Sequence, residues 1–348
     1  MKKNLQKRKR GCGPRGWAGS LLVGAALLIV SCGDTETPPV LGWPATPPEA
    51  LSELDATFYE GIPYGPHREK NVFDLLLPNE RGAAPLLLYF HGGGFRSGSR
   101  SAAWSRNRAR KVAQLIDAGV AIASADYRLL GKGEEIGVIK SLRDSARCLQ
   151  FIRLHARELG IDPERIVLMG ASAGAGTSLW IGTNDDLAEP ESADPVLRQS
   201  TRVRGVILLE TQATYDVARW STDVFPDFGI GVLEGAALLG LEGQLLVFYG
   251  ISELDRFESP EIVEYRRRVD MLGLLTADDP PIFVRNQNQP DEPPVRVNVL
   301  FHHANHAVVV ANRAREVGVE YVLYAPVLGI EDPSGEDDVD FALRLLME

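Results

Sequence analysis

The chain has 348 residues, of which 45% are hydrophobic and 24% charged, a composition that is typical of globular proteins and excludes a mainly disordered chain. Its 47 acidic residues outnumber 37 basic ones, and the formal net charge of −10 argues against a nucleic-acid partner. No self-similar period is visible, which argues against a repeat architecture.

The N-terminal segment is predicted to be an export signal. Residues 1–17 carry only positive charge, and residues 17–30 (WAGSLLVGAALLIV) form an apolar run that is short for a membrane span. This run ends at Ser31-Cys32, which resembles a bacterial lipobox, and Gly33 gives no inner-membrane retention signal. We therefore expect residues 1–31 to be a lipoprotein signal peptide and a lipidated Cys32 to anchor the exported protein to the cell envelope, at the outer membrane. The alternative is an ordinary signal peptide and a secreted protein.

Processing would change the charge and the cysteine content of the chain. Removal of residues 1–31 would leave 30 basic and 47 acidic residues, a formal charge of −17 that repels nucleic acid and anionic headgroups. With Cys32 lipidated, Cys148 would have no cysteine left to pair with. Residues 32–50 are rich in Pro and Thr and are predicted to be a solvated tether, followed by a folded domain over residues 51–348.

The folded part alternates short apolar runs with helical patterns. Apolar residues recur at intervals of three and four between 141 and 160, which predicts a helix that ends at Gly160, and residues 337–346 predict a final amphipathic helix. Strands are predicted at 85–90, 120–127, 165–170, 203–210, 278–286 and 319–326. This alternation predicts an α/β fold with a mostly parallel sheet and helices on both faces.

Two glycine-rich motifs follow predicted strands. GASAG at 170–174 has the pattern G-x-S-x-G, whose glycines permit a tight strand-to-helix turn that exposes the Ser172 hydroxyl. HGGGF at 91–95 follows the strand at 85–90, so its uncovered N–H groups can donate to an oxyanion. We predict an oxyanion hole formed by Gly92, Gly93 and Ala173. The alternative for HGGGF is a glycine-rich turn without a catalytic role.

Together with DYRL at 126–129 and the segment from Asp144 to GASAG, these motifs resemble the α/β-hydrolase esterases. The similarity is greatest to the carboxylesterase and hormone-sensitive-lipase-like group and its feruloyl-esterase-like relatives, and it covers about residues 55–216. The resemblance implies an α/β-hydrolase fold with a helical cap, here around residues 217–275, and a serine nucleophile. It also implies an acid after the seventh strand, a histidine after the eighth, and no cofactor.

The C-terminal third permits two assignments of these roles. In the first, LLVFYG (245–250) is the seventh strand with Asp255 as the acid, and VNVLF precedes the histidines. In the second, which we favour because it leaves no strand over, PPIFV is the seventh strand, Asp291 or Glu292 is the acid, and VEYVLYAP is the eighth strand. No histidine follows that eighth strand.

The segment HHANH at 302–306 holds the last three histidines of the chain. We predict that His306 is the base, oriented by Asp291, with His302 and His303 as further candidates. A histidine at an unusual position in the chain order can still contact the serine, because catalytic triads are defined by their geometry. A metal on two histidines of one helix face is the lesser alternative, since no third ligand is evident.

The sequence therefore predicts a serine hydrolase that cleaves carboxylic esters of small molecules through an acyl-enzyme at Ser172. The missing histidine after the last strand motivates an alternative from a different class, a non-catalytic lipoprotein of the same fold that binds a ligand or partner.

Overall fold

A computed structural model describes residues 40–42, 44–79, 82–229 and 231–348. The predicted signal peptide, Cys32 and residues 32–39 and 43 of the predicted tether lie outside these residues, so export and lipid anchoring remain predictions. Within the described residues, every helix is too short or too polar to cross a bilayer.

The described residues contain one eight-stranded sheet with the order β1-β2-β4-β3-β5-β6-β7-β8. β1 and β2 pair antiparallel, β2 also pairs antiparallel with β4, and all other neighbours are parallel. The strands are β1 Ala56–Pro63, β2 Val72–Pro78, β3 Ala84–Phe90, β4 Ala121–Ala125, β5 Ile161–Ala171, β6 Gly205–Leu209, β7 Ile282–Arg285 and β8 Tyr321–Tyr324. The predicted, mostly parallel sheet is confirmed.

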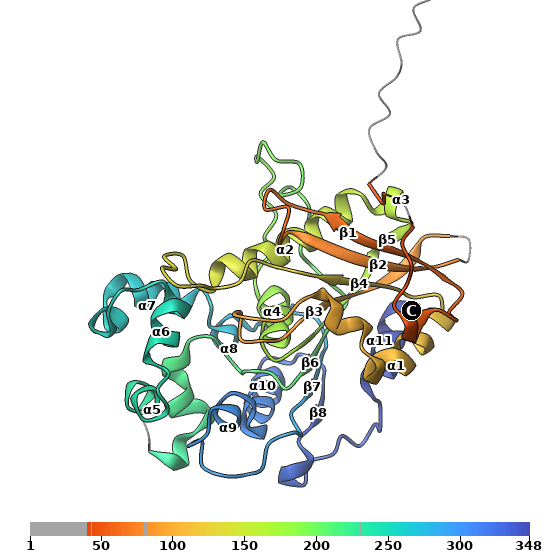
Figure 1. Ribbon diagram of the computed structural model, residues 1–348. Coiled ribbons are helices and arrows are strands. Elements are labelled where there is room, and N and C mark those ends of the chain that lie inside the picture. The colour runs from red at the N-terminus through yellow and green to blue at the C-terminus, as the bar shows by residue number, and fades with distance from the viewer. Residues whose placement is uncertain (1–39, 43, 80–81, 230) are drawn as a thin grey trace, which may run out of the picture. The chain divides into compact units, whose positions relative to one another are not determined.

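Helices cover both faces of the sheet (Figure 1). α1 (Arg106–Asp117) and α11 (Asp338–Met347) pack on one face, and α2 (Ile139–Leu154), α4 (Ala173–Thr183) and α10 (Ala304–Val317) pack on the other. The short helix α3 (Ala156–Leu159) follows α2 and ends at Gly160, as predicted. The predicted helix over 141–160 is thus two helices with a break at His155.

The core has two layers because successive strand residues point to opposite faces. In β3, Leu86 and Leu88 join the layer beneath α2, α4 and α10, whereas Leu87 and Tyr89 join the layer beneath α1 and α11. This burial on both faces explains why the central parallel strands are unbroken apolar runs in the sequence.

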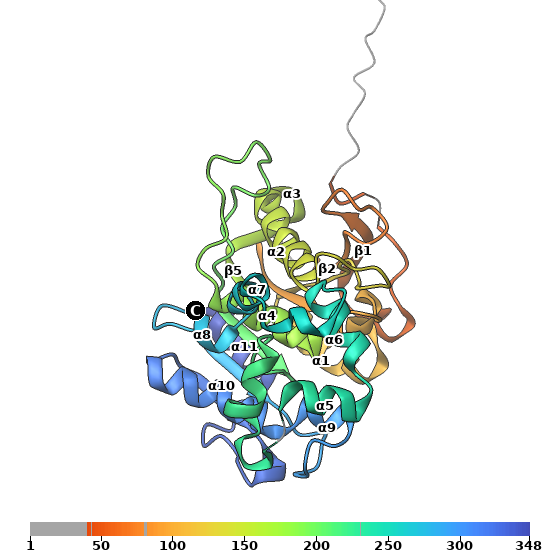
Figure 2. The same cartoon turned by 90° about the vertical axis from the view of Figure 1, so that its left-hand side faces the viewer.

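A helical insertion lies between β6 and β7. It contains α5 (Val232–Leu239), α6 (Glu242–Tyr249), α7 (Pro260–Arg267) and α8 (Met271–Leu274), which gather at one side of the molecule near α9 (Val297–His302) (Figure 2). We call residues 217–275 the cap. The first strand assignment is wrong, because LLVFYG belongs to α6 rather than to a strand. The second strand assignment is confirmed, since IFV of PPIFV lies in β7 and VEYVLYAP contains β8.

Candidate active site

Ser172 lies in the sharp turn between β5 and α4. Its φ of 53° and ψ of −121° are rare for a residue with a side chain, and such strain is characteristic of functional turns. The flanking glycines make the turn possible. A Cβ at Gly170 would meet the Gly174 carbonyl at 2.1 Å, and one at Gly174 would meet the Phe90 carbonyl oxygen at 2.0 Å. The predicted strand–turn–helix context of GASAG is therefore present.

His302 is the histidine that contacts Ser172. Its Nε2 lies 2.8 Å from the Ser172 Oγ, which is within hydrogen-bond distance for a general base. His302 is the last residue of α9, so the helix carries the imidazole to the carboxyl edge of the parallel strands. The sequence favoured His306 and left His302 as a further candidate.

The polar group that raises the pKa of the His302 imidazole is the backbone of Asn298, one helical turn earlier. Burial lowers the pKa of His302 below its ordinary value of 6.5, and the Asn298 backbone opposes this shift. Among the described residues, the ion pairs and hydrogen bonds of His302 include no carboxylate. In the described part of the chain, Ser172 and His302 thus form a serine–histidine pair without a carboxylate contact to the imidazole.

Asp291 lies against His303 rather than against the histidine at Ser172. Its Oδ1 is 3.4 Å from the buried Nε2 of His303, and the His303 Nδ1 accepts a hydrogen bond from the Asn305 N–H at 3.1 Å. Burial lowers the pKa of His303, and the Asp291 carboxylate opposes that shift. Both nitrogens of His303 are therefore directed at groups other than Ser172.

His306, the predicted base, is held elsewhere in the structure. Its Nδ1 accepts a hydrogen bond from the Ala213 N–H at 3.1 Å, and its Nε2 donates to the Leu300 carbonyl at 2.9 Å. It is fully buried, and burial lowers its pKa to about 3. These contacts assign His306 to holding α9 and α10 against the end of β6, so the geometry corrects the predicted pairing of Ser172 with His306.

A break in the helix separates these histidines. His303 has extended backbone angles (φ −55°, ψ 143°), ends α9 and begins α10 by capping the Asn305 N–H. The predicted shared helix face for His302 or His303 with His306 is absent for this reason. Within the described residues, no group of three histidine, cysteine or acidic side chains is placed to hold a metal.

Two side chains hold the connection that carries His302. Asn286, fully buried at the end of β7, accepts from the Thr211 N–H at 2.8 Å and donates to the carbonyls of Thr211 (3.0 Å) and His303 (3.1 Å). Glu210, in a left-handed conformation after β6 (φ 55°), accepts N–H bonds from Gln287 and, at 3.4 Å, from Asn288. Asn286 thus ties the ends of β6 and β7 to the junction of α9 and α10. Sequence reasoning missed it because an asparagine in a turn is common.

The HGGG loop faces Ser172 from β3. Gly93 and Gly94 line the cavity with Ala173, and in the described part of the chain their three N–H groups have no acceptor. Gly93 has a φ of 108°, and a Cβ there would meet the Ser97 carbonyl oxygen at 2.2 Å. Gly92 instead packs on the turn, where a Cβ would lie 2.8 Å from the Ala171 carbonyl oxygen. Of the predicted oxyanion residues, Gly93 and Ala173 line the cavity with Gly94, whereas Gly92 lies behind them.

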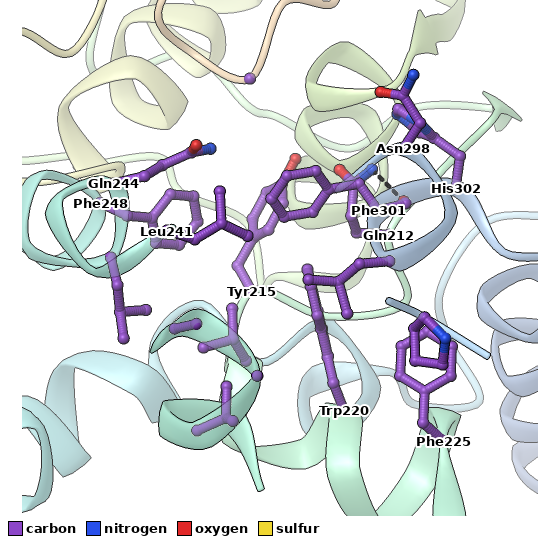
Figure 3. Close-up of a pocket in the computed structure, with 18 of the residues that line it drawn as sticks. Gln212, Tyr215, Trp220, Phe225, Leu241, Gln244, Phe248, Asn298, Phe301 and His302 are labelled. Atoms are coloured by element: carbon purple, nitrogen blue, oxygen red, sulfur yellow. Dashed lines mark hydrogen bonds between the residues drawn. The ribbon is translucent and has the colours of Figure 1, made fainter. Parts of the chain in front are cut away.

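A cavity of about 390 Å³ opens beside Ser172 and His302, between the sheet edge and the cap (Figure 3). Aromatic side chains form much of its wall, namely Phe95, Tyr215, Trp220, Phe225, Phe248 and Phe301. The Tyr215 hydroxyl donates to the Ala173 carbonyl at 2.9 Å, so this residue joins the cavity wall to the turn. The remaining acid candidates, Asp255 and Glu292, are exposed and absent from this lining.

Similar proteins were found by sequence and by structure. The family model described as BD-FAE matches residues 73–222. A truncated carbohydrate esterase from gut microbiota has a TM-score of 0.59 at 16% identity, covering 87% of this chain and 100% of that one. A bacterial heroin esterase has a TM-score of 0.52 at 20% identity, covering 85% and 84%. The chain has the α/β-hydrolase fold. At these identities the structural likeness establishes the fold alone.

The sequence relatives of this α/β-hydrolase are named as esterases. The probable isoprenylcysteine alpha-carbonyl methylesterase ICMEL1 of Arabidopsis thaliana is 31% identical over 143 residues, which is 41% of this chain and 28% of that protein. Carboxylesterase NlhH of Mycobacterium tuberculosis is 36% identical over 138 residues, which is 38% of this chain and 39% of that protein. The α/β-hydrolase described here thus spans less than half the length of both relatives. The resemblance to esterases that the motifs indicated is confirmed.

Proposed function

We propose that the protein hydrolyses carboxylic esters through an acyl-enzyme formed on Ser172, with His302 as the general base. The observation that carries the proposal is the 2.8 Å contact between the Ser172 Oγ and the His302 Nε2 at a strained strand-to-helix turn. A serine hydroxyl is a poor nucleophile until a neighbouring base takes its proton. Esterase relatives on the sequence side support the same reaction class.

In the first step, the Ser172 Oγ attacks the ester carbonyl while its proton passes to the His302 Nε2. The negative charge that develops on the carbonyl oxygen is stabilised by the N–H groups of Gly93, Gly94 and Ala173, which line the cavity beside the serine. The protonated His302 then donates its proton to the leaving alcohol. Water, activated by the same imidazole, attacks the acyl-serine and releases the acid.

The orientation of His302 in this proposal comes from the main chain. The Asn298 backbone favours the protonated imidazole, and we expect its carbonyl to accept from the ring nitrogen that does not face Ser172, which would leave the acceptor nitrogen toward the hydroxyl. A carbonyl stabilises the imidazolium less than a carboxylate does, because it carries only a partial charge. We therefore expect a working serine–histidine pair with a modest rate.

The test is turnover of 4-nitrophenyl butyrate by the whole protein, with Ser172→Ala as the matched control. The proposal predicts hydrolysis that is lost in the control by about 10³-fold or more. A folded wild-type protein that leaves the ester intact would favour a non-catalytic hydrolase-fold protein instead, for which the lack of a carboxylate at His302 gives a reason.

A further inference from the structure

Among the residues that the structure describes, none in the lining of the cavity beside Ser172 carries a permanently charged side chain. Within the described residues, its wall contains no Asp, Glu, Lys or Arg, although these types make up 24% of the chain. His302 is the lining residue that changes charge near neutral pH, and burial lowers its pKa, which keeps it neutral. A ligand that enters the cavity therefore meets no counter-ion in the wall.

Two charged groups that lie beside wall residues in the chain are paired with an opposite charge. Arg219, beside Trp220 in the chain, places its Nη1 2.7 Å from Asp270. Asp216, beside Tyr215, lies 3.3 Å from the Nε of Arg266. Because each of these charges is neutralised by a partner, they offer little net attraction to an ion in the cavity.

The wall is built for apolar and aromatic contact. Tyr215 meets Phe95 and Phe248 edge-to-face, with ring centroids 5.4 Å and 5.5 Å apart, and Trp220 meets Phe301 in the same way at 5.8 Å. The Trp220 indole N–H is bound to the Thr214 carbonyl at 2.9 Å, so the ring presents apolar surface rather than a donor. Such rings favour a bulky apolar or aromatic group.

Three side-chain amides are the principal polar exceptions in the wall. The Gln212 side chain donates to the Phe301 carbonyl at 2.7 Å, so its amide already has a partner within the protein. Gln244, on α6, is half-buried, and its side chain has no hydrogen-bond partner in the described part of the chain. Figure 3 shows Gln244 across the cavity from Asn298 and His302, and its Nε2 lies 3.9 Å from the position of a Cβ on Gly94. Gln244 therefore faces the substrate space beside the HGGG loop.

We propose that this cavity selects uncharged esters with a bulky apolar or aromatic group, and that Gln244 is the position at which its charge selectivity is set. The proposal rests on the proposed function. A carboxylate taken into this space loses its hydration and finds no cation in the wall, while the N–H groups of Gly93, Gly94 and Ala173 are occupied by the ester carbonyl. A neutral chain of the same length loses only weak hydration and gains contact with the aromatic rings.

The test compares two esters that differ in charge at one end, 4-nitrophenyl pentanoate and the mono-4-nitrophenyl ester of glutaric acid. The methyl ester of the second compound is a neutral control for its size. The wild-type protein is expected to prefer the pentanoate over the anionic ester by about 100-fold or more in kcat/KM, with the methyl ester close to the pentanoate.

Gln244→Lys places a cation in the wall with nearly the same side-chain length. This variant is expected to lower the ratio of kcat/KM for the pentanoate to kcat/KM for the anionic ester by about tenfold or more, because the ammonium pairs with the carboxylate of the substrate. Gln114→Lys, on the exposed surface of α1 and outside the lining, adds the same charge and is expected to leave the preference unchanged.

An anionic ester turned over within about threefold of the pentanoate would overturn the inference, as would a preference that Gln244→Lys leaves intact. Both results would leave the proposed ester hydrolysis intact, because the protein would still turn over an ester. Turnover of none of these esters by the folded protein would overturn the proposed function, and this inference with it.

Discussion

Asn286→Asp tests whether the buried amide at the end of β7 positions His302. The substitution keeps the shape of the side chain and exchanges one NH₂ donor for an oxygen. In the wild type, that NH₂ donates to the carbonyls of Thr211 and His303. Each buried group left without its partner costs about 1–3 kcal/mol, so two carbonyls facing an ionised carboxylate cost roughly 2–6 kcal/mol of the free energy of unfolding.

The cost is expected to depend on pH with a definite sign. Burial without a cation raises the pKa of the introduced carboxyl above its ordinary value of about 3.9, and the protonated form can still donate one hydrogen bond. A folded-state pKa above the unfolded one gives stability that is fully present below about pH 4 and is lost as pH rises through the folded pKa. The deficit relative to wild type should therefore be larger at about pH 8 than at about pH 5.

The assay is urea unfolding at these two pH values, combined with the rate at which a fluorophosphonate labels Ser172 in the folded fraction. Asn288→Asp, exposed on the same loop, is the matched control. We expect the labelling deficit of Asn286→Asp to grow with pH as well, because the His303 carbonyl fixes the junction that carries His302. A stability deficit that is equal at both pH values, or no larger than that of the control, would refute the positioning role.

Four further predictions follow from the site and the sequence. Ester turnover by the wild type should fall on the acid side with an apparent pKa below 6.5, because burial lowers the pKa of His302 and the base must be neutral; a midpoint above 6.5 in kcat/KM would contradict this. His306→Gln should lower the free energy of unfolding by about 1–3 kcal/mol yet keep fluorophosphonate labelling of the folded fraction, whereas lost labelling would return His306 to the base position. Gly93→Ala should reduce kcat by about 10-fold or more, since the added Cβ would meet the Ser97 carbonyl oxygen at 2.2 Å and displace an oxyanion donor; unchanged kcat would argue against Gly93 as a donor. Cys32→Ser should abolish incorporation of labelled palmitate in a bacterial host and release the protein from the membrane fraction, while unchanged fractionation would contradict the lipid anchor.

The sheet and the serine turn could be predicted from sequence because their signals are local. Unbroken apolar runs such as residues 85–90 follow from burial on both faces, and GASAG works only between a strand and a helix. The choice of β7 and β8 was also correct, since it left no strand unpaired. In contrast, LLVFYG has the composition of a buried strand, and only its packing in the cap makes it helical.

The choice among the three histidines could not be made from sequence because it depends on one backbone angle. His302, His303 and His306 lie within five residues, and an unbroken helix would have placed His302 and His306 on one face. The extended ψ of 143° at His303 breaks that helix and sends the three rings to three different partners. Asp291 was expected to orient His306, but the ring that it contacts is that of His303.

The central claim is that His302 activates Ser172, and its most direct measurement is the rate of phosphonylation of Ser172, followed by intact mass, in the wild type and in His302→Gln. His303→Gln serves as the neighbour control, scored on the folded fraction. We expect His302→Gln to slow phosphonylation by about 10²–10⁴-fold, and His303→Gln to react at close to the wild-type rate. Equal rates in wild type and His302→Gln would show that the 2.8 Å contact does not activate the serine.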